Sequence, residues 1–511
     1  MFVRKKRNKS GSTSIQIIDK SRGNYRVIHT VGSSRNPVEI ERLHKRAHSK
    51  LDSILHGKQL RLFPSSSSSE DIVEDFLGSL GNENIRTVGP ELIFGTLFDQ
   101  IGFNVIPEPL FRQLVVTRLV YPASKLKTVD YIYRYQGHII TEDAVYKFLD
   151  RFTDRHKDEA EKIAFTYTQK IVKDITVVFY DMTTLYFDAK EEDDLRKIGF
   201  SKDGKFQKPQ IMLGLLVAEN GYPIGYNIFE GNTFEGHTLI PVLEEMQKKF
   251  NLAKPVVIAD AGLLSKKNLT ALTEQQYKFI IGGRIKNESK NIKNNILSKS
   301  KRMKNGSSFS IKKKNGHRLI VTYSDKRARK DAFNRERGLE RLKKRIKSGK
   351  LTKENINNRG YNKFISMQGE IQVNIDEQKI IEDRKWDGLK GYITTTGLRN
   401  KTIVENYRHL WRIEKAFRIS KHDLRIRPMY HYKRKRIEAH ICIAFVAYTV
   451  WKELERLLNA DNIQMTPTRA AELASNMYAI EYQLPETGEI KQQVLNMSSE
   501  QQTLWKTVRN R

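Results

Sequence analysis

The spacing of apolar residues changes from one region of the chain to the next. Residues Ser14–Asp19 and Tyr25–Thr30 alternate apolar and polar side chains around Arg22-Gly23-Asn24, which predicts a β-hairpin. Apolar residues then recur at helical spacing over about Pro37–His56, so we expect a charged amphipathic helix there. Pro64 and the serine run that follows it indicate a linker.

The segment from about Asp71 to Val172 has the apolar spacing of several short helices. Ser124, Thr141 and Asp154 stand where helices begin and are suitable N-terminal caps. Basic side chains on these helices fit a helix-turn-helix that binds DNA, but they fit an ordinary helical bundle equally well. The pattern does not decide between the two.

Short apolar runs replace the helical spacing from Ile175 onward. Asn220-Gly221 joins two of these runs and predicts a tight hairpin. Helices are expected at His237–Phe250 and Leu264–Thr273, and strands followed by alternating helices and strands predict a mixed α/β sheet. The expected strands are Ile175–Tyr180, Pro209–Ala218, Tyr222–Phe229, Val256–Ala259, Tyr277–Ile285 and Leu389–Thr395.

A basic stretch interrupts this α/β pattern. Residues Lys301–Lys350 contain nineteen Lys or Arg and four Asp or Glu, and the short strand-like runs Lys363–Gln368 and Ile371–Ile375 follow. We therefore interpret residues 287–385 as an insertion within the α/β domain. After it, long helices are expected over about Thr402–His422 and Arg434–Leu458.

These patterns divide the chain into five parts, and 511 residues suit several domains of roughly 100–200 residues each. We expect an N-terminal hairpin and helix (1–63), a helical DNA-binding domain (70–172), an α/β domain in two segments (173–286 and 386–458), the basic insertion (287–385) and a C-terminal tail (459–511).

Composition narrows the choice of partner. The chain has 91 Lys or Arg against 59 Asp or Glu, a formal net charge of +32, which favours a polyanion such as nucleic acid. An anionic membrane surface is the competing partner. The longest apolar run, Ile441–Trp451, is too short to span about 30 Å of hydrocarbon, and the basic N-terminus lacks the apolar stretch of a signal peptide. The single cysteine, Cys442, excludes an internal disulfide framework.

Two aspartates directly follow predicted strands. Asp181 ends the run Ile175–Tyr180 and Asp260 ends Val256–Ala259, and functional groups tend to lie at the carboxyl ends of strands in open sheets. Carboxylates from separate elements can hold Mg²⁺, and a pair of such ions activates phosphodiester chemistry. An aspartate at such a position also commonly forms a turn or caps a helix. Competing acids in the same region are Asp188, Asp203 and Glu230.

A third candidate acid, Glu414, lies on the predicted helix over Thr402–His422. Tyr407 and Lys421 stand seven residues before and after it, which places the three side chains on one face of a continuous helix. A carboxylate between a phenol and an ammonium suits a phosphate backbone. The charged face of an ordinary amphipathic helix has the same pattern.

Three blocks of the sequence resemble the DDE transposases of bacterial insertion sequences. ITVVFYDMTTLYF (175–187) is similar to the block of their first aspartate, and PVVIADAGLLSKKNL (255–269) to that of the second. NYRHLWRIEKAFRISKHDLRIRPMYHYKRKRIEAHICIAFVAY (406–448) resembles the glutamate block of the group with a Tyr-Arg-Glu-Lys signature. The resemblance covers about residues 90–455.

This resemblance implies a ribonuclease H-like mixed α/β sheet interrupted by a β-rich insertion, with a mainly helical N-terminal region. It also implies that Asp181, Asp260 and Glu414 bind two Mg²⁺ ions, which Mn²⁺ can replace. Tyr407 and Lys421 match the signature's DNA-contacting tyrosine and lysine.

One position departs from the signature. Its arginine would stand four residues before Glu414, where this chain has Leu410. Arg418, four residues after Glu414, shares its helical face, and we hypothesise that it takes over a phosphate contact. Further candidate DNA contacts lie in the basic run Lys433, Arg434, Lys435 and Arg436, which also fits a solvated loop.

The implied function is that of a DNA transposase. Such a protein binds the terminal inverted repeats of its element as a homodimer, cleaves double-stranded DNA there and joins the freed 3′-hydroxyl to target DNA. Two alternatives remain: a ribonuclease H-like nuclease on branched DNA, which does not join strands, and a non-catalytic DNA-binding protein. We expect a cytoplasmic, nucleoid-associated location and no membrane partner.

Overall fold

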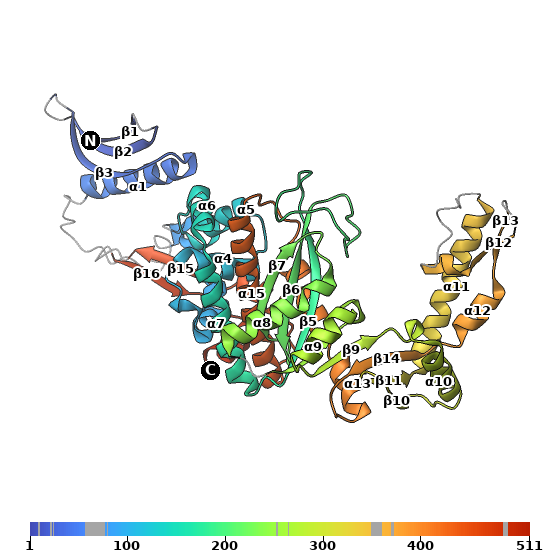
Figure 1. The fold of residues 1–511 in the computed structure, drawn as a ribbon. Helices are drawn as coiled ribbons and strands as arrows, with labels where there is room; N and C mark the ends of the chain where they lie inside the picture. The colour runs from blue at the N-terminus through green and yellow to red at the C-terminus, as the bar shows by residue number, and fades with distance from the viewer. Residues whose placement is uncertain are drawn as a thin grey trace. The chain divides into compact units, whose positions relative to one another are not determined.

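The computed structural model describes residues 1–8, 11–20, 23, 25–56, 77–78, 80–251, 254–263, 265–348, 360–368, 372–483 and 489–510. The linker predicted around Pro64, and the turn residues Arg22 and Asn24, lie outside these residues. The chain forms two compact units, Met1–Leu80 and Gly81–Arg511 (Figure 1).

The first unit contains an antiparallel sheet in the order β1-β2-β3 and one helix, α1 (Pro37–His56). Strands β2 (Thr13–Asp19) and β3 (Arg26–Ser34) confirm the predicted hairpin. Strand β1 (Phe2–Arg7) was not predicted, because basic residues occupy both of its faces. Apolar side chains of β2 and α1 form a small core.

The second unit begins with β4 (Ile85–Thr87) and a group of helices. Ser124 and Thr141 cap their helices as predicted, accepting hydrogen bonds from the amides of Lys127 and Ala144. The third predicted cap is wrong by one residue, because Thr153 rather than Asp154 precedes its helix. The α-helices are α3 (Thr96–Ile101), α4 (Pro109–Val120), α5 (Lys125–Tyr131), α6 (Glu142–Arg151) and α7 (Asp154–Val172).

The long helix α15 (Arg434–Ala460) is buried along its middle and packs against α4, α6 and α7. None of the helices in the described part of the chain combines the length and apolarity needed to cross a membrane. The C-terminal segment contains α16 (Pro467–Ser475), β15 (Tyr478–Gln483), β16 (Ile490–Val494) and α17 (Ser499–Arg509). Strand β15 pairs with β4, so the two ends of this unit share one sheet.

An eight-stranded mixed sheet forms the centre of the second unit, in the order β10-β11-β14-β9-β8-β5-β6-β7 (Figure 1). Strands β5, β6 and β7 are antiparallel neighbours, whereas β8 is parallel to β5 and β9 to β8. The order β7-β6-β5-β8-β9 with these directions is that of a ribonuclease H-like sheet, as predicted. The bounds are β5 (Val177–Tyr186), β6 (Gln210–Ala218), β7 (Pro223–Glu230), β8 (Val256–Ala259) and β9 (Phe279–Gly283).

Helices α8 (Leu239–Phe250) and α9 (Lys266–Glu274) connect the later strands, close to their predicted positions. Separate apolar clusters draw on alternate residues of β5, with Phe179 in one and Val178 and Tyr180 in the other. Because side chains of a strand alternate between its faces, the sheet is buried on both sides. Burial on both faces holds the strand ends in fixed positions.

The sheet continues into the interval predicted as an insertion. Strands β10 (Ser308–Lys312) and β11 (Arg318–Tyr323) pair in sequence onto β14 (Leu389–Thr394), which pairs with β9. The rest of the interval contains α10 (Lys290–Ser300), α11 (Asp325–Lys347), α12 (Glu377–Arg384) and a hairpin of β12 (Ile365–Gln368) with β13 (Gln372–Ile375). The hairpin corresponds to the two strand-like runs that follow the basic stretch.

Strand β5 is longer than predicted, and Asp181 lies inside it. The antiparallel ladder with β6 runs on past Asp181, which pairs with Leu215, to Tyr186. The parallel ladder with β8 stops one residue before Asp181, at the pair formed by Tyr180 and Ala259. The prediction that Asp181 ends its strand is therefore wrong for the pairing with β6, because Met182-Thr183-Thr184 continue as buried strand residues.

The predicted helix over Thr402–His422 is broken. Helix α13 (Asn400–Arg408) ends before α14 (Trp411–Arg418), and a π-helical turn (Ile419–Asp423) follows. At the break the amides of Leu410 and Ile413 bond carbonyls three residues back, which is tighter than α-helical bonding. The seven-residue spacing of Tyr407, Glu414 and Lys421 therefore does not place them on one helix face.

Candidate active site

Asp181 and Asp260 lie side by side on neighbouring parallel strands. Tyr180 of β5 pairs with Ala259 of β8, and each aspartate directly follows its paired residue. Adjacent strands are about 4.8 Å apart, so the two carboxylates meet where β8 ends. Asp260 Oδ1 also accepts the amides of Gly262 at 2.7 Å and Leu263 at 3.3 Å. Asp260 thus stabilises the turn after β8, as expected for an aspartate that forms a turn. Both of these hydrogen bonds use Oδ1, so they leave Oδ2 available to bind a ligand.

Two residues that the sequence did not indicate complete this cluster. Lys202 Nζ lies 3.6 Å from Asp181 Oδ1 and 2.7 Å from Glu235 Oε1, and it donates a hydrogen bond to the carbonyl of Met182 at 2.6 Å. A methyl group on Gly262 would lie 2.9 Å from both Asp260 Oδ1 and Glu235 Oε2. Glu235 therefore faces both aspartates.

Neither Lys202 nor Glu235 carries a signal in the local pattern. Lys202 lies in the loop between β5 and β6, and Glu235 begins a 3-10 turn (Glu235–His237) after β7. Both segments connect strands whose order could be predicted, but periodicity does not specify how a loop returns over the end of a sheet. The sequence offers Glu230 as a competing acid, whereas the structure brings Glu235 to the cluster.

The cluster carries more negative than positive charge. Burial, together with the charges of Asp260 and Glu235, raises the pKa of Asp181 to about 6 against the opposing effect of Lys202. Burial lowers the pKa of the Lys202 ammonium, but Asp181 and Glu235 outweigh that effect, so the pKa is raised overall. One ammonium faces three carboxylates, and such a site favours an additional cation.

Tyr407 lies near all three predicted metal ligands. It does so even though the helix break separates it from Glu414. Burial raises the pKa of its phenol, and the charges of Asp260, Glu414 and Asp181 add to the rise. The ring packs beneath Lys390 Nζ at 4.5 Å from its centroid. The charge of Glu414 also acts on Lys390, where it opposes the burial that lowers the pKa of the ammonium. Glu414 itself is exposed in the first turn of α14.

The donor chemistry of the cluster fits a divalent cation. Among the described residues, no three His, Cys, Asp or Glu side chains are arranged closely enough to hold a metal ion. The side chains that converge here nevertheless offer carboxylate oxygens, which Mg²⁺ and Mn²⁺ prefer. The Lys202 ammonium stands between Asp181 and Glu235, where it takes the role of a cation.

The remaining residues of the predicted signature lie in different surroundings. Lys421 is nearly buried, and its Nζ lies 3.2 Å from Asp203 Oδ2. Asp203 also pairs with Arg427, so Lys421 has an acidic partner. Leu410, at the position where the resemblance predicts an arginine, is buried in the main core.

Arg418 is exposed on α14. It lines a hollow of about 530 Å³ together with Trp451 of α15 and Pro467 of α16. The structure thus brings Asp181, Asp260 and Tyr407 together, with Glu414 beside Tyr407, whereas Arg418 faces a separate hollow.

The basic run 433–436 is partly neutralised by acids. Arg436 makes two bonds of 2.6 Å to Asp150, and Lys433 lies 3.7 Å from the same carboxylate. Arg434 pairs with Glu438 at 2.9 Å. The side chains of Lys433 and Arg434 are still about two-thirds exposed, at 67% and 66%, and Lys435 is exposed as well. These three can reach an external partner, while Arg436 is more strongly engaged within the protein.

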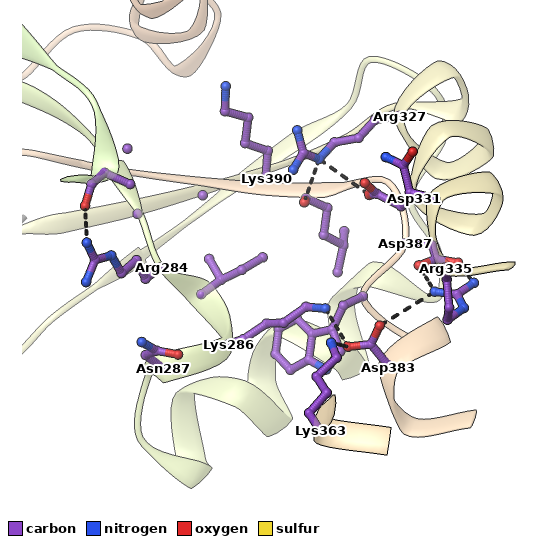
Figure 2. A pocket seen from close by; sticks show the side chains of 18 of the residues that line it. Arg284, Lys286, Asn287, Arg327, Asp331, Arg335, Lys363, Asp383, Asp387 and Lys390 are labelled. Atoms are coloured by element: carbon purple, nitrogen blue, oxygen red, sulfur yellow. Dashed lines mark hydrogen bonds and ion pairs between the residues drawn. The ribbon is translucent and has the colours of Figure 1, made fainter. Parts of the chain in front are cut away.

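A pocket of about 680 Å³ adjoins the aspartates, since Ala261, Gly282 and Tyr407 line it. Figure 2 shows Lys286 and Lys363 both reaching Asp383, at 2.8 and 2.7 Å. The lining side chains include six cations and three aspartates. They are Arg284, Lys286, Arg327, Arg335, Lys363, Lys390, Asp331, Asp383 and Asp387. This excess of cations suits a negatively charged ligand next to the carboxylates.

Residues 173–450 match the model of a protein family described as "Transposase DDE domain". The matched segment covers more than half of the chain and contains Asp181, Asp260 and Glu414. No curated protein shows significant sequence similarity to the chain.

Similarity to solved structures is weak. A piggyBac transposase synaptic complex with hairpin DNA is 9% identical, with 76% of each chain covered and a TM-score of 0.39. A Mos1 transposase paired-end complex with the left transposon end is 11% identical, with 48% of this chain and 68% of that chain covered and a TM-score of 0.16.

Proposed function

Because this chain belongs to the family of transposase DDE domains, we propose that it is the transposase of a bacterial insertion sequence of the Tyr-Arg-Glu-Lys group. It binds the terminal inverted repeats of its element as a homodimer, cleaves the DNA and joins the freed ends to target DNA. The observation that carries this proposal is the placement of Asp181 and Asp260 directly after the last paired residues of two adjacent parallel strands, inside the matched segment.

We assign Asp181, Asp260 and Glu414 as the residues that hold two divalent cations, Mg²⁺ or Mn²⁺. When bound, such ions activate the attacking oxygen and stabilise the leaving oxygen of a phosphodiester. Burial of the sheet on both faces keeps the two aspartates in place. The raised pKa of Tyr407 keeps its phenol protonated, so its hydroxyl can donate a hydrogen bond to a phosphate oxygen.

Charge supports DNA as the substrate. The chain has a formal net charge of +32, and phosphate neutralisation by Lys and Arg drives DNA binding through counterion release. Exposed cations are provided by Lys433, Arg434 and Lys435. Lys421 leaves its partner Asp203 and contacts a DNA phosphate instead. We assign end recognition to the helical segment 70–172, catalysis to 173–286 with 386–458, and further phosphate contacts to 287–385. The segment 1–63 is a further part, the segment 459–511 belongs to the main unit through the pairing of β15 with β4, and the protein acts at the nucleoid.

Substitution of the three acids tests the proposal. We expect Asp181→Asn, Asp260→Asn and Glu414→Gln each to abolish Mg²⁺-dependent cleavage and joining of DNA that carries the element's ends. DNA binding, measured by fluorescence anisotropy, should remain. Asp188→Asn is the matched control, because Asp188 follows β5 but pairs with Lys208 at 2.7 Å. Cleavage at the wild-type rate by any of the three variants would remove that residue from the site.

The same assay distinguishes the alternative functions. Cutting of branched DNA without sequence preference, and without joining, would replace the transposase by a ribonuclease H-like nuclease. Steeply salt-dependent binding with no metal-dependent cutting would indicate a non-catalytic DNA-binding protein.

The hypothesis for Arg418 needs its own variant. Arg418→Ala should weaken binding to the element ends and reduce strand transfer, because it removes an exposed guanidinium that can contact phosphate. Unchanged binding and transfer would show that Arg418 does not replace the signature's arginine.

A further inference from the structure

A second basic pocket lies between the N-terminal helices and the segment that leads into α15. Its volume is about 510 Å³, and it is lined by residues of α4, α5, α6, α15 and the chain from Arg425 to His431. Five lining residues carry a positive charge, and none of the described residues that line the pocket is acidic. The five are Arg118, Lys125, Lys127, Arg425 and Arg427.

Two of these cations are buried. Only 5% of Arg118 and 6% of Lys125 is exposed. The Arg118 guanidinium donates to the carbonyl of Leu424 at 2.9 Å and lies 3.4 Å from His440 Nδ1, while its buried Nε has no partner. Lys125 has no hydrogen-bond or ion-pair partner among the described residues. Both groups therefore remain electrostatically uncompensated inside the protein.

Uncompensated buried cations are costly, and two of them near one another increase that cost. The same positive charges lower the pKa values of two side chains in the pocket, His431 and Lys125. Burial and the charges of Lys125, Arg118 and Arg436 lower the pKa of His431 to about 4. Burial and Arg118 lower the pKa of Lys125. Buried polar groups normally have a partner in the protein, a water or an ion, and two neighbouring buried cations suit an anion.

We infer that this pocket binds a phosphodiester group of DNA, with Lys125 and Arg118 as its buried partners. This inference rests on the proposed function. Arg427 lines the pocket and pairs with Asp203, which also binds Lys421. Asp203 directly follows Lys202, the partner of Asp181. The pocket is therefore linked to the carboxylate cluster through Arg427, Asp203 and the adjacent residue Lys202, and its lining residue His431 stands two residues before the exposed Lys433.

The cations of the pocket suit an anionic phosphate group rather than a neutral base. A guanidinium and an ammonium together match several oxygens of one tetrahedral anion. Arg118 is already held by the carbonyl of Leu424, so binding costs it little further ordering. Lys127 is exposed at the rim and can contact a neighbouring phosphate of the same strand.

Thermal unfolding of the full-length protein without divalent metal tests for the anion. Inorganic phosphate should raise the melting temperature of the wild type more than chloride at equal ionic strength. The variant Lys125→Met should lose this specific increase and be more stable than the wild type in phosphate-free buffer. Lys125→Arg should keep the response, as should the control Lys170→Met, which removes an exposed lysine of α7. No phosphate-specific increase in the wild type, or an unchanged increase in Lys125→Met, would overturn the inference.

Binding to a fluorescent duplex with the element's end, without metal, identifies the source of the phosphate. Lys125→Met should weaken binding roughly 10- to 100-fold, as expected for loss of a charged hydrogen bond, and reduce the slope of log affinity against log salt by about 1. Lys170→Met should retain wild-type affinity. If Lys125→Met loses the phosphate response but binds DNA normally, the pocket holds a free anion and the assignment to DNA is wrong. Because the phosphate response requires no cleavage, it would persist even if the proposed transposase activity failed its own test.

Discussion

Lys202 Nζ lies 3.6 Å from Asp181 Oδ1, within the cluster that also contains Glu235 and Asp260. In the absence of metal, this ammonium partly neutralises carboxylates that would otherwise repel one another. A divalent cation bound by Asp181 would have to share that carboxylate with the lysine. Lys202 is therefore expected to control both the stability of the metal-free cluster and its affinity for metal.

Replacement of Lys202 by Met should increase the affinity for Mn²⁺ roughly tenfold, or about 1.4 kcal/mol, because it removes a competing cation. The variant should also be less stable than the wild type without metal. Titration calorimetry and thermal unfolding measure the two effects. Lys205→Met, which removes an exposed lysine of the same loop, should change neither. Equal Mn²⁺ affinity in Lys202→Met and the wild type would show that the ammonium does not compete.

Glu235→Gln should raise the Mg²⁺ concentration needed for half-maximal cleavage about tenfold, because it removes one carboxylate that faces Asp181 and Asp260. Excess Mg²⁺ should restore part of the rate. Glu230→Gln is the matched control, since Glu230 ends β7 with an exposed side chain. If the metal dependence of Glu235→Gln matches that of the control, Glu235 takes no part in binding.

Gly282→Ala should disturb the site through Tyr407. The added methyl group would lie 2.6 Å from the Tyr407 hydroxyl oxygen and 3.1 Å from the amide of Ala261, the residue after Asp260. We expect a loss of about 1–3 kcal/mol in the free energy of unfolding, together with slower cleavage. Urea denaturation gives the first quantity. Gly397→Ala, which meets nothing within 4 Å, should have neither effect, and a wild-type rate in Gly282→Ala would mean that Tyr407 can move without consequence.

His431 should make the protein less stable as the pH falls below neutral. Burial, Lys125, Arg118 and Arg436 lower its pKa from 6.5 to about 4. The folded state therefore keeps the ring neutral while the unfolded chain takes up a proton. Its contribution is complete above pH 6.5 and is lost as the pH falls from 6.5 to 4, by at most about 3 kcal/mol.

Denaturation of His431→Asn at pH 7.5 and pH 5 measures this contribution. The variant should show a smaller difference between the two pH values than the wild type. Part of the difference should remain, because the pKa of neighbouring His440 is also lowered, by burial and by Arg118 and Lys125. His138→Gln, a change at an exposed histidine, should behave as the wild type. An unchanged difference in His431→Asn would contradict the assignment.

Local patterns in the sequence were sufficient for most of the α/β elements. Helix α1 and strand β8 have their predicted bounds, and Asn220-Gly221 joins the β6–β7 hairpin as expected. These elements depend on side-chain alternation and turn residues, which are properties of neighbouring positions. The sequence pattern did not predict the break between α13 and α14, because apolar spacing continues through Leu410. The break is visible only in the backbone hydrogen bonds, which there join residues three apart.

The sequence by itself determined the basic charge, the order of strands and helices, and the three blocks that contain Asp181, Asp260 and Glu414. Only the tertiary structure decided that Lys202 and Glu235 join the two aspartates, and that Arg118 and Lys125 share a pocket whose described lining residues include no acid. The physical reason is that local periodicity records which side of an element is buried, whereas contacts between loops and helices far apart in sequence depend on how the sheet and its covering helices pack.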